Sequence, residues 1–239
     1  MHILITSGGT SEAIDSVRSI TNHSTGSLGK ILAETALAKG HQVTLITTPT
    51  ALKPDPHPQL RLLLIDNVEE LLSQMKKEVP RHQVLIHAMA VSDYTPVYMT
   101  GLDEVKNAQD LHTFIHRENH ETKISSKEEY QVLFLKKNPK IISLVKEWNP
   151  AIQLIGFKLL VDVSSEELIQ VARESLVKNH ASMIVANDLT KIQNGQHQAY
   201  LVTDDHVLEA STKTEIAEAI LRYIKQKGTY DTHYFSGYR

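Results

Sequence analysis

Hydrophobic residues along the chain form short runs that alternate with longer stretches in which apolar positions recur at helical spacing. Helices are expected over 27–40, 67–79, 139–148, 165–178 and 212–228, and strands over 2–6, 42–47, 60–65, 83–90, 131–135, 152–157 and 182–187. Residues 199–210 form two further strand-like runs around Asp204 and Asp205, which predicts a C-terminal β-hairpin. This alternation predicts an α/β fold with a mostly parallel sheet flanked by helices.

One long stretch breaks the pattern. Residues 95–130 are polar, with only a short helical indication over 102–115, and they follow the fourth expected strand. Open α/β sheets bind ligands at the carboxyl ends of their strands, so we expect this weakly structured insertion to be a flexible lid, with a disordered segment as the alternative. The sequence contains no interdomain linker. We therefore expect a single domain over 1–228 and a loose tail over 229–239.

Composition narrows the class of protein. The 239 residues include 41% hydrophobic and 22% charged residues, with a formal net charge of −3, so a nucleic-acid partner is not expected. No apolar run reaches the roughly 20 residues that cross a bilayer, so no membrane association is expected. The absence of cysteine excludes disulfides and a thiolate nucleophile. The first strand begins directly after Met1, leaving no room for a signal peptide, and we expect a cytoplasmic location.

An unusually long loop separates the first strand from its helix. Ser7, Gly8, Gly9 and Thr10 follow the strand and could offer backbone N–H groups to an anion, and the loop then carries Arg18 and Asn22. Gly26 and Gly29 would let the helix N-terminus pack closely against the strand and face a phosphate. Two alternatives remain: a loop capped by its own polar side chains, and glycines that serve packing alone.

Familiar nucleotide signatures are missing from this region. A Walker A motif would need glycine where the chain has Ser24, and the second strand ends without an acidic residue to bind a ribose, which counts against an ordinary NAD site. Small residues, Ala88, Met89 and Ala90, end the fourth strand, and Asp93 follows them. Asp93 could orient Mg²⁺ on phosphates or could merely cap the next segment.

Three residues further along are weaker candidates. Lys123 lies in the polar insertion, where it could stabilise a polyphosphate or be an ordinary surface lysine. Phe157 ends a strand and could contact a nucleobase or belong to the core. Asn187 ends the next strand, where it would face a ligand or help to cap the following turn.

Read in order, the segments SGGTSEAIDSVRSITNHSTGSLG, AVSDY, KIS, KNPKI, GFK and VANDL resemble those of phosphopantothenate–cysteine ligases, over about residues 2–225. The resemblance implies a Rossmann-like fold, a homodimer and a role in coenzyme A biosynthesis. It implies that 4′-phosphopantothenate, cysteine and CTP (or ATP) are substrates, with Mg²⁺ but without flavin, and that an acyl-nucleotide is the intermediate. It also implies a stand-alone ligase whose product is used by a separate flavin-dependent decarboxylase.

The resemblance also assigns roles to residues. The expected catalytic residues are Asn22 and Lys123, and Asp93 is the expected metal ligand. The expected phosphopantothenate contacts are Gly9, Thr10, Arg18, Asn22 and Ala90. The expected nucleotide contacts are Ser7, Gly8, Gly26, Gly29, Ala88, Met89, Asp93, Asn138, Phe157, Lys178 and Asn187.

Two positions depart from the family pattern. Ser92 replaces the usual alanine of A-V-A-D-Y, and Ser175 stands roughly where bacterial relatives carry a second lysine near Lys178. The choice between CTP and ATP is therefore open, with CTP favoured. Two other functions are weighed against the ligase: an NAD(P)-dependent short-chain oxidoreductase, and a non-catalytic nucleotide-binding protein.

Overall fold

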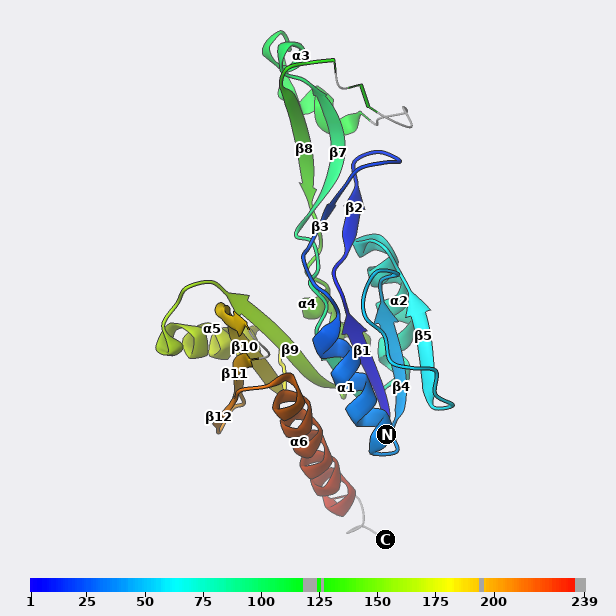
Figure 1. Ribbon diagram of the computed structural model, residues 1–239, viewed down its shortest axis with the longest axis vertical. Coiled ribbons are helices and arrows are strands. Elements are labelled where there is room, and N and C mark those ends of the chain that lie inside the picture. The colour runs from blue at the N-terminus through cyan, green and yellow to red at the C-terminus, as the bar shows by residue number, and fades with distance from the viewer. Residues whose placement is uncertain (118–123, 126, 194–195, 235–239) are drawn as a thin grey trace.

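Eight strands form the main sheet of the protein, in the order β12-β11-β10-β9-β6-β1-β4-β5 (Figure 1). The computed structural model describes residues 1–117, 124–125, 127–193 and 196–234, with 228–234 as backbone only. The strands are β1 (His2–Ser7), β4 (Gln42–Thr47), β5 (Leu60–Leu64), β6 (Val84–His87), β9 (Gln153–Leu160), β10 (Met183–Gln193), β11 (Gln196–Val202) and β12 (Val207–Ala210). Those from β5 to β10 pair in parallel, and β11 and β12 form the predicted antiparallel hairpin, so the predicted fold class is confirmed.

Helices cover both faces of this sheet. The helices are α1 (Ser27–Ala38) and α6 (Lys213–Tyr234) on one face, and α2 (Val68–Glu78), α4 (Ile141–Trp148) and α5 (Ser165–Lys178) on the other. A short 3₁₀ helix, η1 (Val79–Arg81), extends α2. The central strands carry continuous apolar runs because each of their faces packs against a separate core cluster. Helix α6 continues to Tyr234, and the looseness expected of the tail over 229–239 stays a prediction.

A second, smaller unit projects from the carboxyl edge of the sheet (Figure 1). We call it the arm. It consists of the antiparallel pair β7 (Tyr94–Gly101) and β8 (Gln131–Lys137), with α3 (Leu102–Lys106) and η2 (Leu111–His116) between them, and the short pair β2 (Ser11–Ala13) and β3 (Ser19–Thr21). Strand β2 contacts β7, so both pairs belong to one projection.

Aromatic packing organises the outer part of the arm. The ring of Phe114 is 1% exposed and stacks between Tyr98 and Phe134, at centroid distances of 5.9 and 5.0 Å. The guanidinium of Arg117 lies 4.9 Å from the centre of the Phe114 ring. The expectation of little regular structure over 95–130 is therefore wrong for the residues described there. The flexibility expected of this segment stays a prediction.

Candidate active site

The loop that follows β1 and the loop that follows β6 are joined at Thr10. The Thr10 N–H donates to the carbonyl of Ala90 at 3.1 Å, and the Ala90 N–H donates to the carbonyl of Gly8 at 2.9 Å. The Asn22 N–H donates to the carbonyl of Thr10 at 3.2 Å. Gly9 allows this return, because a Cβ there would lie only 2.3 Å from the Asn22 carbonyl oxygen. Four predicted substrate contacts, Gly9, Thr10, Asn22 and Ala90, therefore lie together.

The N-terminus of α1 packs directly against the end of β1. The hydroxyl of Ser7 donates to the carbonyl of Gly26 at 3.2 Å, just before the helix begins. A Cβ on Gly29 would lie 2.1 Å from Ser7 Oγ, so only glycine permits this approach. The backbone N–H groups of the first helical turn thus lie beside the end of the first strand, which is the arrangement of a phosphate-binding edge.

Ser92, which departs from the family pattern, has a structural explanation. Its hydroxyl accepts a hydrogen bond from Thr10 Oγ1 at 2.9 Å, and its N–H donates to the same Thr10 oxygen at 2.9 Å. The residue is 2% exposed. An alanine would leave the Thr10 hydroxyl without this buried acceptor, so Ser92 strengthens the junction between the two loops.

Asn138 connects this junction to the arm. Its Nδ2 donates to the Ser92 carbonyl at 3.0 Å, and its Oδ1 lies 2.8 Å from Thr95 Oγ1. Thr95 Oγ1 also lies 2.9 Å from Glu12 Oε2, and Glu12 Oε1 accepts from the N–H of Val68 at 3.0 Å. Asn138 therefore has structural partners here and does not line the neighbouring cavity. Its predicted contact with a nucleotide stays a prediction.

A cavity of about 530 Å³ opens beside the junction, between strands β6 and β9 and helices α4 and α5. Four of the predicted nucleotide contacts line it, namely Met89, Asp93, Phe157 and Lys178. Its volume is in the range of small-molecule sites. Ala88 belongs to the same loop and packs against the core on the α1 side.

Asn187 lies elsewhere. It is 6% exposed on β10, and it is not among the residues that line this cavity. The next residue, Asp188, accepts hydrogen bonds from the N–H groups of Asp162 and Val163 at 3.0 and 3.1 Å. Backbone donors, with that of Thr190 the strongest, lower the pKa of Asp188 to about 2. Asp188 therefore binds backbone groups on both sides of it in the fold, and the predicted role of Asn187 stays a prediction.

Asp93 stands at the mouth of the cavity. Its carboxylate is 62% exposed and forms an ion pair with Lys140, while its carbonyl accepts from the Asn138 N–H at 2.8 Å. Within the described part of the chain, no group of three or more His, Asp or Glu side chains could hold a metal ion. A magnesium ion at Asp93 would need most of its ligands from substrate phosphates and water.

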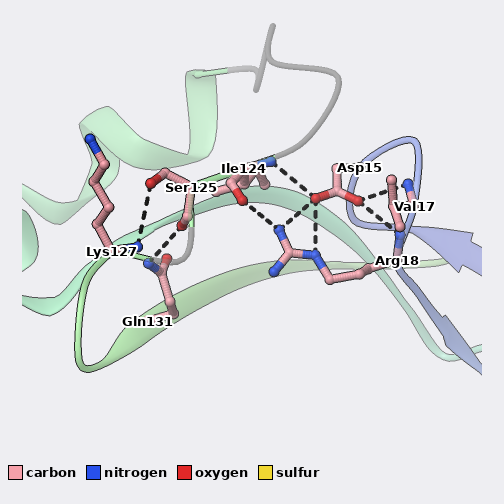
Figure 2. A network of polar contacts seen from close by, with 7 residues as sticks. All are labelled: Asp15, Val17, Arg18, Ile124, Ser125, Lys127 and Gln131. Carbon is pink, nitrogen blue, oxygen red and sulfur yellow. Dashed lines mark hydrogen bonds and ion pairs between the residues drawn. The ribbon is translucent and has the colours of Figure 1, made fainter.

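Arg18 belongs to a polar clamp at the turn between β2 and β3 (Figure 2). Its Nε and Nη2 donate to Asp15 Oδ2 at 3.0 and 2.5 Å, while Oδ1 of the same carboxylate accepts the N–H groups of Val17 and Arg18. The Asp15 side chain is fully shielded from solvent. The hydrogen bonds from Arg18 hold the pKa of Asp15 well below its ordinary value.

This clamp also holds a distant segment. Asp15 Oδ2 accepts the Ile124 N–H at 3.1 Å, and Arg18 Nη2 donates to the Ile124 carbonyl at 3.0 Å (Figure 2). Both backbone polar groups of Ile124 are thus bound by the β2–β3 turn. Lys123, the predicted catalytic lysine next to it, lies outside the described residues.

Four residues of this region, namely Glu12, Asp15, His87 and Ser92, were given no role from the sequence. The Asp-x-x-Arg spacing could have identified Asp15, because an aspartate readily caps a turn and can pair with an arginine three residues later. His87 could have been identified as a polar residue within an otherwise continuously apolar strand. The sequence around Glu12 and Ser92 carries no comparable signal, because their partners are distant in the chain.

Residues 1–113 and 111–227 match the family described as the DNA/pantothenate metabolism flavoprotein C-terminal domain. The chain belongs to this family. It is 35% identical to the coenzyme A biosynthesis bifunctional protein CoaBC of Thermococcus kodakarensis over 222 residues, which is 91% of this chain and 49% of that protein. Against CoaBC of Methanocaldococcus jannaschii, identity is 32% over 227 residues, 94% of this chain and 50% of the relative. The chain spans about half the length of the curated relatives that it matches.

Solved structures of the family share the fold. The DNA/pantothenate metabolism flavoprotein from Streptococcus pneumoniae is 61% identical, with a TM-score of 0.91 over 95% of this chain and 99% of that one. The C-terminal domain of a CoaBC protein is 28% identical, with a TM-score of 0.70 over 95% and 94%. A Cab2 variant in complex with phosphopantothenate-cysteine, 20% identical over 96% and 88% with a TM-score of 0.71, shares the fold.

Proposed function

We propose that this chain joins 4′-phosphopantothenate to L-cysteine in coenzyme A biosynthesis. A carboxylate oxygen of 4′-phosphopantothenate attacks the α-phosphorus of CTP (or ATP), and pyrophosphate leaves. The cysteine amine then attacks the acyl carbon, the amide forms, the nucleoside monophosphate leaves and the amine loses a proton. Membership of the family and the geometry of the two joined loops support this proposal.

The observation that carries the proposal is the placement of Asn22 and Ala90 on either side of Thr10, beside the cavity. The reaction needs no protein nucleophile, because the nucleotide activates the carboxylate. It needs donors that bind the acyl oxygen as negative charge develops there. The side-chain amide of Asn22 has no hydrogen-bond partner among the described residues, so it is available as such a donor.

Other groups take supporting roles in this proposal. Gly9, Thr10 and Arg18 contact phosphopantothenate or shape its site, while Gly8, Gly26 and Gly29 border the triphosphate. Lys123 stabilises charge on the polyphosphate. The base and ribose occupy the cavity with Met89, Phe157 and Lys178, and Asn138 and Asn187 are further nucleotide contacts. CTP is favoured over ATP.

Magnesium is a further part of the proposal. A single exposed carboxylate with room for phosphate oxygens is a donor set that Mg²⁺ accepts in nucleotide enzymes, so Asp93 would hold it. When bound, the ion would neutralise phosphate charge. Asp93 also forms an ion pair with Lys140. No electron is transferred in the reaction, so no flavin is required of this chain.

One feature of the sequence matches the oxidoreductase alternative. Tyr223 and Lys227 have the four-residue spacing of the catalytic pair of short-chain oxidoreductases. The Tyr223 hydroxyl, however, donates to the carbonyl of Ser182, which precedes β10 at the amino edge of the sheet. This pair therefore lies at the opposite edge from Thr10 and the cavity, and it does not favour that alternative.

A homodimer is also proposed, with the arm as the contact surface. Apolar side chains on the arm are exposed to solvent: Val17 is 68% exposed, Tyr94 is 49% exposed and Leu135 is 45% exposed. Surface of this kind favours association. Leu135→Lys should give a monomer in sedimentation equilibrium. Leu64→Lys, on the edge strand β5, is the control and should leave the dimer intact. A monomeric wild-type chain would contradict the proposal.

The product keeps the carboxylate of cysteine, so a separate flavin-dependent decarboxylase is its proposed consumer. The curated relatives, which are about twice as long, are called bifunctional. No helix in the described ranges is long and apolar enough to cross a membrane. The cytoplasmic location and the absence of a nucleic-acid partner stay predictions.

Pyrophosphate release tests the proposed function. The protein is incubated with Mg²⁺, 4′-phosphopantothenate and CTP or ATP, with and without cysteine, and pyrophosphate and the amide product are measured. Release should depend on 4′-phosphopantothenate, and the amide should appear only with cysteine. Nucleotide binding without release would favour the non-catalytic alternative, and NADPH binding without release would favour the oxidoreductase.

A further inference from the structure

The cavity beside the active site contains a buried polar group that the proposed roles do not use. His87 ends β6, lines the cavity and is 8% exposed. Two other buried polar residues of the lining bond to protein groups: Ser92 to Thr10, and Asn179 to the Ser175 carbonyl. Only one nitrogen of the His87 ring has a hydrogen-bond partner in the described part of the chain.

The hydrogen bonds of Thr6 determine which ring nitrogen carries the proton. Thr6 Oγ1 lies 2.7 Å from His87 Nδ1 and accepts the Met89 N–H at 3.3 Å. A hydroxyl can accept two hydrogen bonds and donate one, and among the described residues His87 Nδ1 is the group that can accept the Thr6 proton, so we assign this direction. Nδ1 is therefore unprotonated, and a neutral ring carries its proton on Nε2.

The ring is neutral at physiological pH. Burial lowers the pKa of His87 from 6.5 to about 4. The remaining Nε2–H group is then an uncharged donor at the wall of the cavity. A donor that loses contact with water when a ligand binds needs an acceptor from the ligand, so a ligand that supplies one at this point gains affinity over one that does not.

We propose that His87 selects the base of the nucleotide, by donating from Nε2–H to a carbonyl oxygen of a pyrimidine. This inference rests on the proposed function. A carbonyl oxygen projects from the ring and accepts over a broad range of angles. Cytosine has such an oxygen. Adenine has no carbonyl: its exocyclic amino group is a donor, and its acceptors are ring nitrogens, which lie within the outline of the ring and accept over a narrower range of angles.

The neighbours of His87 in the cavity favour this role. Met89, Val91 and Val171 present apolar surface to a base, whereas the charged side chains of Glu174 and Lys178 are exposed at the rim. Of the three buried polar side chains in the described lining, Ser92 and Asn179 are bound to protein groups, whereas His87 keeps a ring nitrogen without a protein partner. The lining also includes Ser143, Lys158 and Ser175, so the cavity combines apolar surface with a small number of polar groups, as specific ligand sites do.

Nucleotide binding without the other substrates tests the inference apart from catalysis. CTP and ATP are titrated calorimetrically into the wild-type protein, His87→Phe, which keeps a ring without a donor, and His87→Gln, which keeps an N–H donor. His87→Phe should weaken CTP binding about tenfold, as for one neutral hydrogen bond. ATP binding should change by less than about twofold, and His87→Gln should recover part of the CTP affinity.

The tautomer provides a second measurement on the unmodified protein. Nitrogen-15 spectra of the histidine-labelled wild type should show His87 with a bare Nδ1 and a protonated Nε2. The opposite tautomer would overturn the inference even if the variants do not fold. Equal CTP affinity of the wild type and His87→Phe would also overturn the inference. That result would not contradict the ligase proposal, which is tested by pyrophosphate release from the wild type. Failure of the ligase proposal would instead show as an absence of release in the wild type.

Discussion

The main sheet and the arm are built on different physical principles. In the sheet, side chains such as Ile5 and Leu85 are fully buried, and helices pack on both faces. In the arm, three stacked rings and the Asp15–Arg18 clamp hold strands whose other apolar side chains are only partly buried or exposed. The sheet is stabilised by apolar area, whereas the arm depends on a few specific contacts.

This difference separates stability from function. Phe114 belongs to neither of the two core clusters of the sheet, so the arm can loosen without removing the main hydrophobic core. The proposed reaction site lies where the two units meet, at Thr10 and Asn138. We therefore expect substitutions in the sheet to change the free energy of unfolding, and substitutions at the junction to change turnover.

The largest effect on stability is expected in the sheet. Ile155 is fully buried on β9, and Ile155→Ala should cost about 4 kcal/mol through lost transfer free energy and the cavity that remains. Urea unfolding followed by circular dichroism measures this. Leu159→Ala, on the same strand but 50% exposed, is the matched control and should cost less than about 1 kcal/mol. Similar losses in both variants would contradict the proposed role of the core.

The largest effect on turnover is expected at the junction. Asn22→Asp replaces an amide donor with an acceptor and should lower pyrophosphate release about a hundredfold. The unfolding midpoint should stay unchanged, because the Asn22 contact within the junction is made by its backbone. Asn107→Asp, at the end of α3, is the control and should release pyrophosphate at the wild-type rate. Normal turnover of the Asn22 variant would remove its side chain from the mechanism.

Acid should affect the sheet before the clamp. The folded-state pKa of His87, about 4, lies below its ordinary value of 6.5, so the unfolded state binds more protons between these values. Stability is therefore complete above pH 6.5 and falls as pH decreases toward 4, with about 2 kcal/mol lost from this residue at pH 5. Unfolding free energies at pH 7 and pH 5 measure the loss.

His87→Gln should remove that part of the loss. Burial also lowers the pKa values of His82 and His197, and their contribution should be the same in both proteins. Asp15 has a lowered pKa, so its contribution is present above its ordinary value of 3.8 and is lost only at lower pH. Equal pH dependence in wild type and variant would show that His87 is not the responsible group.

The smallest effect on global stability is expected in the arm. Phe114→Ala should remove the centre of the ring stack and speed amide hydrogen exchange in β7 and β8. The unfolding midpoint should change little, because the main core is untouched. Exchange mass spectrometry with β1 and β9 as internal references separates the two units. Faster exchange in β9 as well would show that sheet and arm unfold together.

The accuracy of the sequence-based predictions follows the same division. Runs such as 42–47 and 83–90 identified the strands of the sheet, because burial on both faces requires continuous apolar residues. In the arm, the apolar run within 131–135 predicted strand β8, whereas β7 has no continuous apolar run and was missed, and the Phe114 stack joins rings far apart in the sequence.

The candidate site divides in a similar way. Gly9, Gly29 and Asn22 could be identified from a long local motif, because glycine is required wherever backbones approach so closely. The positions of Asn138 and Glu12 could not, since their partners lie on other elements. Asp15 and Arg18 are three residues apart, but their hold on Ile124 appears only when the arm is folded.

The sequence by itself therefore determined the α/β alternation, the hairpin at the end and the glycine-rich entrance, because these depend on local periodicity and local backbone conformation. Only the tertiary structure decided that the insertion forms an arm and that Thr10 joins two loops. It alone placed the Nε2–H group of His87 at the wall of a cavity. Long-range contacts of this kind depend on how separate elements pack, so they cannot be predicted from any single stretch of the sequence.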